Sequence, residues 1–165
     1  MLDLAAGSGR HTRHLRSLGY SVTAVDVDVR GLRDLAKDAN VEIVEADLEG
    51  DEWPFGERLF DGIVVTNYLH RPLLPKLADA LAPGGVLIYE TFGEGNEVYG
   101  RPTNPDYLLR DGELLEVYDK RLDIIAYEHV REEQPRPAVR QRLCAALTQD
   151  AAEAPERHTD TGGGS

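Results

Sequence analysis

The sequence is poor in cysteine, in positive charge and in long apolar runs. Its 165 residues include a single cysteine, so no disulfide can form within the chain and an oxidising compartment gains no support. Thirty acidic residues against eighteen basic ones give a formal net charge of −12, which disfavours nucleic acid and anionic lipid as partners. No apolar run approaches the roughly 18 to 20 residues of a membrane-spanning helix, and no basic-then-apolar leader opens the chain. These absences predict a soluble, cytoplasmic protein.

What the sequence does contain is an alternation of strands and helices over a length typical of one domain. A first strand is predicted to begin at Met1. Further strands are predicted at residues 21–25, 41–44, 61–66, 86–91, 122–130 and 139–147. Helices are predicted at residues 10–18, 29–37, 73–81 and 108–118. Chains of this pattern build doubly wound parallel sheets, and the last two strands are close enough in sequence to pair antiparallel.

Two segments depart from this alternation. Residues 92–106 are rich in glycine, proline and asparagine, and a loop of this length is typical of a functional segment. Residues 148–165 carry no aromatic residue and end in Gly-Gly-Gly-Ser, which predicts a disordered acidic and glycine-rich tail. The predicted domain therefore covers residues 1–147.

A ligand site is predicted at the carboxyl ends of the first three strands, where open α/β sheets bind their ligands. Gly7, Ser8 and Gly9 form a turn after the first strand, and glycine lets the backbone turn tightly and approach a ligand. Asp26 follows Gly9 by 17 residues, near the spacing at which a carboxylate accepts hydrogen bonds from ribose hydroxyls. Asp47 closes the third predicted strand. Together these residues predict a nucleoside site.

A dinucleotide is the main competing ligand, because its fingerprint also places glycines between a strand and a helix. That fingerprint is G-x-G-x-x-G, with the helix N-terminus free to receive a pyrophosphate. Here Ala5 replaces the first glycine, no third glycine follows Gly9, and Asp3 lies in the first strand where it would repel phosphate. These departures favour a zwitterionic or cationic ligand such as S-adenosylmethionine.

Five segments resemble the successive motifs of the class I S-adenosylmethionine-dependent methyltransferases. They are residues 3–9 (DLAAGSG), 23–26 (TAVD), 45–47 (EAD), 60–65 (FDGIVV) and 81–87 (LAPGGVL). The resemblance covers about residues 1–147 and is, more narrowly, to small bacterial members of the tellurite-resistance and thiopurine type. It implies a Rossmann-like seven-stranded sheet of order 3-2-1-4-5-7-6 with one antiparallel strand. The helices that usually precede the first strand in this family, and cover the cofactor, are expected to be absent.

The resemblance also implies which residues bind S-adenosylmethionine. Asp3 and residues 7–9 would meet its methionine part, Asp26 its ribose, and Asp47 with the Leu48 backbone its adenine. The full predicted cofactor-binding set is Asp3, Ala5, Gly7, Ser8, Gly9, Asp26, Val27, Asp47, Leu48 and Asn67. No metal is predicted.

The predicted catalytic residues are His70 and Tyr68, which follow the fourth strand. Methyl transfer is an in-line displacement, so the protein has to align donor and acceptor and, for a weakly acidic acceptor, remove a proton. His70 is a candidate base or acceptor contact, or else a polar residue at a helix start. Tyr68 either stacks on the acceptor or packs as a half-exposed aromatic. Arg71 and Arg101 either hold an anionic acceptor or are surface arginines.

The predicted function is methyl transfer to a small-molecule acceptor. One alternative is an RNA or protein methyltransferase, which the acidic charge disfavours. That alternative also lacks the Asn/Asp-Pro-Pro-Tyr tetrad, in whose place residues 67–70 read Asn-Tyr-Leu-His. The other alternative is a catalytically silent binding or scaffold protein. A homodimer is the predicted assembly.

Overall fold

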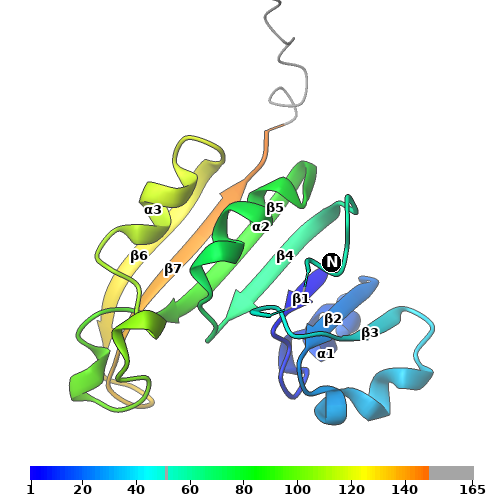
Figure 1. Cartoon of the computed structure of the whole chain (residues 1–165), viewed down its shortest axis with the longest axis horizontal. Helices are drawn as coiled ribbons and strands as arrows, with labels where there is room; N and C mark the ends of the chain where they lie inside the picture. Colours follow the sequence, from blue (N-terminus) through cyan, green and yellow to red (C-terminus); the bar gives the residue numbers. More distant parts are fainter. Residues whose placement is uncertain (51, 149–165) are drawn as a thin grey trace, which may run out of the picture.

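The computed structural model describes residues 1–50 and 52–148 (Figure 1). Beyond Thr148, the predicted tail lies outside these described residues, and its disorder stays a prediction. None of the described helices is long and apolar enough to cross a membrane.

The described residues form a seven-stranded sheet of order β3-β2-β1-β4-β5-β7-β6 (Figure 1). Its strands are β1 (Leu2–Leu4), β2 (Val22–Asp26), β3 (Val41–Glu45), β4 (Phe60–Thr66), β5 (Leu81–Phe92), β6 (Asp123–Glu132) and β7 (Ala138–Ala146). β7 pairs antiparallel with both of its neighbours, whereas all other neighbouring strands pair parallel. The predicted strand order and the single antiparallel strand are therefore confirmed.

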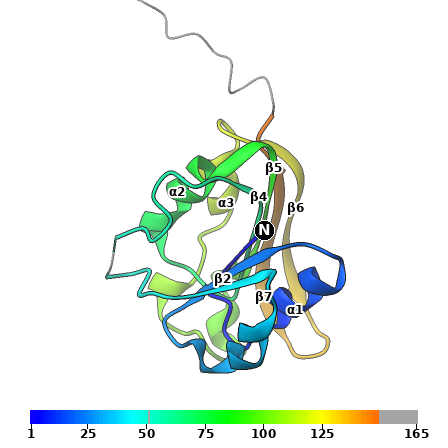
Figure 2. The same ribbon diagram turned by 90° about the vertical axis from the view of Figure 1, so that its right-hand side faces the viewer.

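Helices lie on both faces of the sheet (Figure 2). α2 (Leu74–Asp79) and α3 (Glu113–Tyr118) cover one face, and α1 (Arg10–Ser17) lies on the other. The larger core cluster joins Leu2 and Leu4 of β1 to residues of α2 and α3. A smaller cluster forms where Leu15 of α1 packs with Val22 and Val64. Alternate side chains of the central strands are thus buried on opposite faces, as a doubly wound sheet requires.

Three predicted helices differ from the observed ones. Residues 29–37 form a 3₁₀ helix, η1 (Val29–Lys37). This helix packs closely on the glycine turn: a Cβ built on Gly31 would lie only 2.9 Å from the Ser8 Cα. The helix predicted at residues 73–81 starts earlier, with the 3₁₀ turn η2 (Arg71–Leu73), and ends with α2 because Leu81 already pairs in the sheet. The helix predicted from residue 108 starts only at α3, because the Leu109 N–H donates to the Phe92 carbonyl instead.

The long segment after β5 holds two short 3₁₀ turns, η3 (Asn96–Val98) and η4 (Pro105–Tyr107). Asn96 is buried and anchors the segment to β7, because its Oδ1 accepts a 3.1 Å hydrogen bond from the Val139 N–H. Leu109 also bridges to Gly93, so the two ends of the loop lie together. The loop is therefore an ordered wall beside the carboxyl ends of β4 and β5.

Candidate functional site

A sharp turn leads the chain from β1 into α1. Ala5 and Gly7 both have φ of 55°, and Gly9 has φ of 78°. The turn is fixed to the sheet because the Ala6 N–H donates to the Val25 carbonyl, and it is closed by a bond from the Gly9 N–H to the Ala6 carbonyl. Its backbone therefore lies at the carboxyl edge of the sheet.

The two glycines of this turn serve different purposes. A Cβ built on Gly9 would clash with the Leu32 Cδ2 and would lie 2.8 Å from the Arg13 Nη1, so these side chains would have to shift to admit it. A Cβ built on Gly7 would have nothing within 4 Å. The space in front of Gly7 is open, as expected where a ligand approaches the backbone.

Asp26 ends β2 with its carboxylate held by backbone donors. Its Oδ2 accepts from the Gly7 N–H at 2.8 Å, and its Oδ1 accepts from the Asp28 N–H at 3.0 Å. An ionised carboxylate has about four acceptor sites, so these two bonds fix its direction and leave capacity for a ligand.

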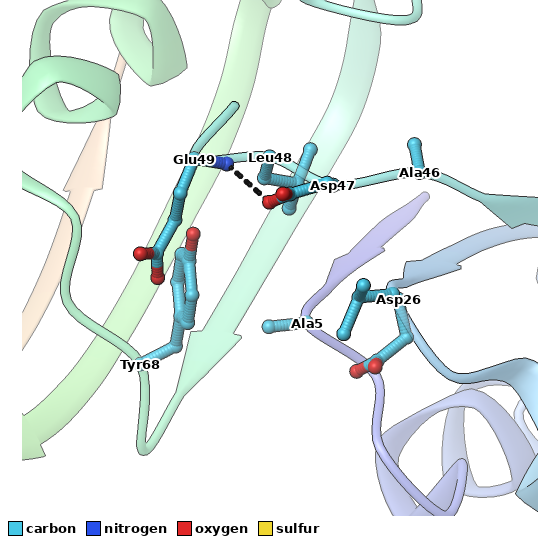
Figure 3. A pocket seen from close by; sticks show the side chains of 8 residues that line it. Ala5, Asp26, Ala46, Asp47, Leu48, Glu49 and Tyr68 are labelled. Atoms are coloured by element: carbon cyan, nitrogen blue, oxygen red, sulfur yellow. Dashed lines mark hydrogen bonds between the residues drawn. The ribbon is translucent and has the colours of Figure 1, made fainter. Parts of the chain in front are cut away.

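A pocket of about 140 Å³ lies at the ends of β1 to β4 (Figure 3). Its lining residues are Ala5, Asp26, Val27, Ala46, Asp47, Leu48, Glu49 and Tyr68. The segment after β3 is folded back by a 2.9 Å bond from the Glu49 N–H to the Asp47 Oδ1. We call this space the strand-end pocket. It brings together six residues that the sequence predicted: Ala5, Asp26, Val27, Asp47, Leu48 and Tyr68.

The Tyr68 side chain forms one wall of this pocket, with the Glu49 carboxylate beside its ring (Figure 3). Its hydroxyl is buried and makes no hydrogen bond of ordinary geometry within the described residues, although the Glu49 carboxylate lies within reach of it. Burial raises the Tyr68 pKa well above its usual value, and the carboxylates of Glu49, Asp47 and Asp26 raise it further. The hydroxyl therefore stays protonated and offers a donor to a ligand.

A second pocket, of about 200 Å³, shares Glu49 and Tyr68 with the first. Its lining residues are Glu49, Asn67, Tyr68, Leu69, Thr91, Phe92, Pro102 and Tyr107. We call it the aromatic pocket. Asn67, with φ of 53°, is fixed there by its N–H bond to the Glu90 carbonyl and by Arg140, which donates to its Oδ1 at 2.8 Å.

Other predicted residues lie outside these two pockets. His70 lines an open hollow together with Trp53 and Lys76, and this hollow shares Leu48 and Glu49 with the strand-end pocket. Arg71 is held in place by the buried Glu113, to which it donates at 2.6 and 2.9 Å, and by the Leu108 carbonyl at 2.8 Å. Arg71 is thus a structural clamp on the loop before α3, and Arg101 is exposed. Neither arginine lines the aromatic pocket.

Asp3 is buried beneath the turn and is not a wall of the strand-end pocket. It is 2% exposed, and its Oδ2 accepts a 2.5 Å hydrogen bond from the Thr12 hydroxyl of α1. Burial raises the Asp3 pKa, although the Thr12 hydrogen bond opposes this effect. Asp3 therefore fixes α1 relative to β1 from behind the turn.

Glu49 is the site residue that sequence reasoning missed. It lines both pockets, yet it stands in an acidic run with no motif of its own, two residues after Asp47. With Asp26 and Asp47 it makes the rim negative, which suits a cationic or zwitterionic ligand better than a phosphate. Over residues 1–50 and 52–148, no group of three or more His, Cys, Asp or Glu is arranged to hold a metal ion.

Comparison with solved structures finds the same fold. An S-adenosylmethionine-dependent methyltransferase from Methanosarcina mazei superposes with a TM-score of 0.67 and 18% identity, over 89% of this chain and 91% of that one. The 1,6-didemethyltoxoflavin-N1-methyltransferase of Burkholderia thailandensis gives a TM-score of 0.67 and 21% identity, over 89% of this chain and 70% of that one. At these identities the comparisons establish a shared fold.

Sequence comparison gives the family. A demethylmenaquinone methyltransferase from Clavibacter sepedonicus is 34% identical in a 97-residue alignment, and the match covers 53% of this chain but only 39% of that protein. A family model described as a methyltransferase domain matches residues 1–85, more than half of the 165 residues. The chain therefore belongs to the methyltransferase domain family, and the predicted resemblance to the class I S-adenosylmethionine-dependent methyltransferases is confirmed.

Proposed function

We propose that this protein transfers a methyl group from S-adenosylmethionine to a small-molecule acceptor. The observation that carries the proposal is the meeting of two pockets at Glu49 and Tyr68. A donor in the strand-end pocket and an acceptor in the aromatic pocket would face each other across these two side chains. Such alignment is the main requirement of an in-line displacement.

The strand-end pocket and the adjoining glycine turn, whose residues 7–9 do not line that pocket, fit the cofactor. The open space at Gly7 admits a ligand against the backbone, and the buried Tyr68 hydroxyl is a protonated donor at the pocket wall. In the proposed arrangement Asp26 accepts from the ribose hydroxyls, and Asp47 with the Leu48 backbone binds the adenine. Residues 7–9 hold the methionine part. When bound, S-adenosylmethionine supplies a methyl group on a positively charged sulfur.

The remaining predicted residues receive narrower roles. We assign Asp3 to positioning, because it is buried against Thr12 and acts through α1. Ala5 and Val27 are pocket walls, and Asn67 borders the acceptor side. His70 lines neither pocket, so its role as a base stays a sequence-based prediction, as do the homodimer and the cytoplasmic location.

A small acceptor is supported by the lining of the aromatic pocket, where the rings of Tyr68, Phe92 and Tyr107 offer flat apolar surface. The Burkholderia neighbour was solved with 1,6-didemethyltoxoflavin and S-adenosylhomocysteine bound, so the same fold accommodates a small acceptor in that protein.

Calorimetric titration with S-adenosylhomocysteine tests the proposal. We expect one site per chain, and a loss of about 1 to 3 kcal/mol of binding free energy in Asp26→Ala, the range for hydrogen bonds to a charged group. Asp123→Ala is the matched control, because it removes an exposed carboxylate on β6, outside both pockets. Absence of binding by the wild-type protein, or equal affinities for Asp26→Ala and wild type, would contradict the proposal.

A further inference from the structure

The aromatic pocket combines apolar walls with a single charge. Aromatic rings come from Tyr68, Phe92 and Tyr107, and Leu69 and Pro102 complete the apolar surface. Among the described lining residues, Glu49 is the sole ionisable carboxylate, and none is a lysine, arginine or histidine. The uncharged polar groups of the lining are the Asn67 amide, the Thr91 hydroxyl and the tyrosine hydroxyls. A ligand here meets flat hydrophobic surfaces, and Glu49 is the one charged hydrogen-bond acceptor.

Arg140 does not reverse this charge. Its guanidinium lies 4.2 Å from the centroid of the Phe92 ring and donates to the Asn67 Oδ1, so it contacts two lining residues. However, it is already paired with Glu90 at 3.1 Å and with Glu132 at 3.4 Å. A carboxylate or phosphate in the pocket would face Glu49 without a cation of its own.

The Glu49 carboxylate favours ligands that donate a hydrogen bond to it. An ionised carboxylate accepts hydrogen bonds and cannot give one, and bonds to a charged acceptor are roughly twice as strong as neutral ones. Aromatic rings favour stacked or edge-on contact with another planar ring. The ligand that satisfies both requirements is a planar heterocycle or aryl amine with an N–H group.

We infer that the aromatic pocket binds planar aromatic nitrogen compounds, with Glu49 accepting the hydrogen bond of the ligand N–H. This inference rests on the proposed function for the identity of the pocket as the acceptor site. It specifies the chemical class of the methyl acceptor and identifies Glu49 as the residue that recognises it. Glu49 stands at the boundary of both pockets, so the bound nitrogen would lie beside the strand-end pocket.

A matched pair of probes tests the inference. Benzimidazole and benzoxazole share one bicyclic shape, but an oxygen replaces the N–H in benzoxazole. Benzoate serves as the anionic probe. Binding is measured by ligand-observed NMR titration at pH 8, both with and without saturating S-adenosylhomocysteine. We expect benzimidazole to bind about fivefold or more tightly than benzoxazole, the ratio that corresponds to one net hydrogen bond of roughly 1 kcal/mol, and benzoate to bind weakest.

Glu49→Gln is the decisive variant, because it keeps the size of the side chain and removes its charge. We expect the preference for benzimidazole to fall severalfold in Glu49→Gln and to persist in Glu57→Gln. Glu57 is an exposed carboxylate that lines neither pocket. A thermal melt verifies that each variant is folded.

Two results would overturn the inference: equal affinity for benzimidazole and benzoxazole, or a preference that Glu49→Gln leaves intact. Failure of the proposed function is distinguishable, because it would appear as absence of S-adenosylhomocysteine binding in calorimetry. The probe titration without that ligand still reports on the aromatic pocket.

Discussion

The backbone N–H of Gly7 donates a 2.8 Å hydrogen bond to the Oδ2 of Asp26. This bond joins the turn after β1 to the last residue of β2, so two adjacent strand ends share one fixed carboxylate. A carboxylate already oriented by the protein does not have to be ordered when a ligand arrives, which favours binding.

The two glycines of the turn should respond differently to the same substitution. Gly9→Ala should destabilise the protein by about 2 kcal/mol or more. The left-handed conformation costs an alanine roughly 1 to 2 kcal/mol, and overpacking against Leu32 typically costs about 1 to 3 kcal/mol more. Gly7→Ala should cost only the conformational term, since its Cβ meets nothing within 4 Å.

Ligand affinity should respond in the opposite order: Gly7→Ala should weaken binding more than Gly9→Ala does. Gly7→Ala fills the space in front of the turn and should lose most of its affinity for S-adenosylhomocysteine even where the protein is fully folded. Urea denaturation and calorimetry measure the two quantities separately. A Gly7→Ala protein with wild-type affinity would show that the ligand does not approach this backbone.

Ala5 stands where the family motif has glycine, and its φ of 55° is unusual for a residue with a Cβ. Ala5→Gly should therefore stabilise the protein by about 0.5 to 1 kcal/mol, because relief of the left-handed conformation outweighs the added freedom of the unfolded chain. Ala6→Gly is the control. Ala6 has no positive φ, so its replacement should destabilise the protein in urea denaturation. Destabilisation by both substitutions would mean that Ala5 is not strained.

The clamp between Arg71 and Glu113 should make stability depend on pH. Burial opposes ionisation of Glu113, but the hydrogen bonds from Arg71 and from the Arg110 N–H prevail and hold its pKa below the usual 4.5. A lowered pKa means that the carboxylate contributes stability above its unfolded pKa, and that this contribution is lost as pH falls through the folded pKa.

Glu113→Gln should accordingly destabilise the protein at neutral pH by about 1.5 to 3 kcal/mol, the range for hydrogen bonds to charged groups. The difference from wild type should shrink as pH falls below the usual glutamate pKa. Urea denaturation across this pH range measures the difference. Glu116→Gln, which removes an exposed carboxylate 3.5 Å from Arg110, should show little effect at any pH. A constant difference for Glu113→Gln would contradict the assignment.

Much of the fold followed from the sequence because strands and ligand residues obey local rules. Residues 62–65 of β4 are buried without a break, as their continuous apolar run predicted. Asp26 and Asp47 were found because each follows a strand, and parallel strands place their carboxyl ends at one edge.

The errors arose where tertiary contacts outweighed local preference. Leu108 and Leu109 fit a helical pattern, but the backbone of Leu109 is used to close the long loop. Arg71 resembled a surface or substrate-binding arginine until the loop that it holds was known. Glu49 had no pattern at all, since only the folding of the segment after β3 brings it beside Tyr68.

The most direct test of the account is to locate the ligand on the protein. Isotope-labelled protein is titrated with S-adenosylhomocysteine while assigned amide resonances are followed. We predict saturable shifts at Gly7, Leu48 and Glu49, with no change at Leu59 and Phe60, which line a hollow outside the strand-end pocket. Unchanged resonances at Gly7 and Leu48, or shifts confined to Leu59 and Phe60, would contradict the account.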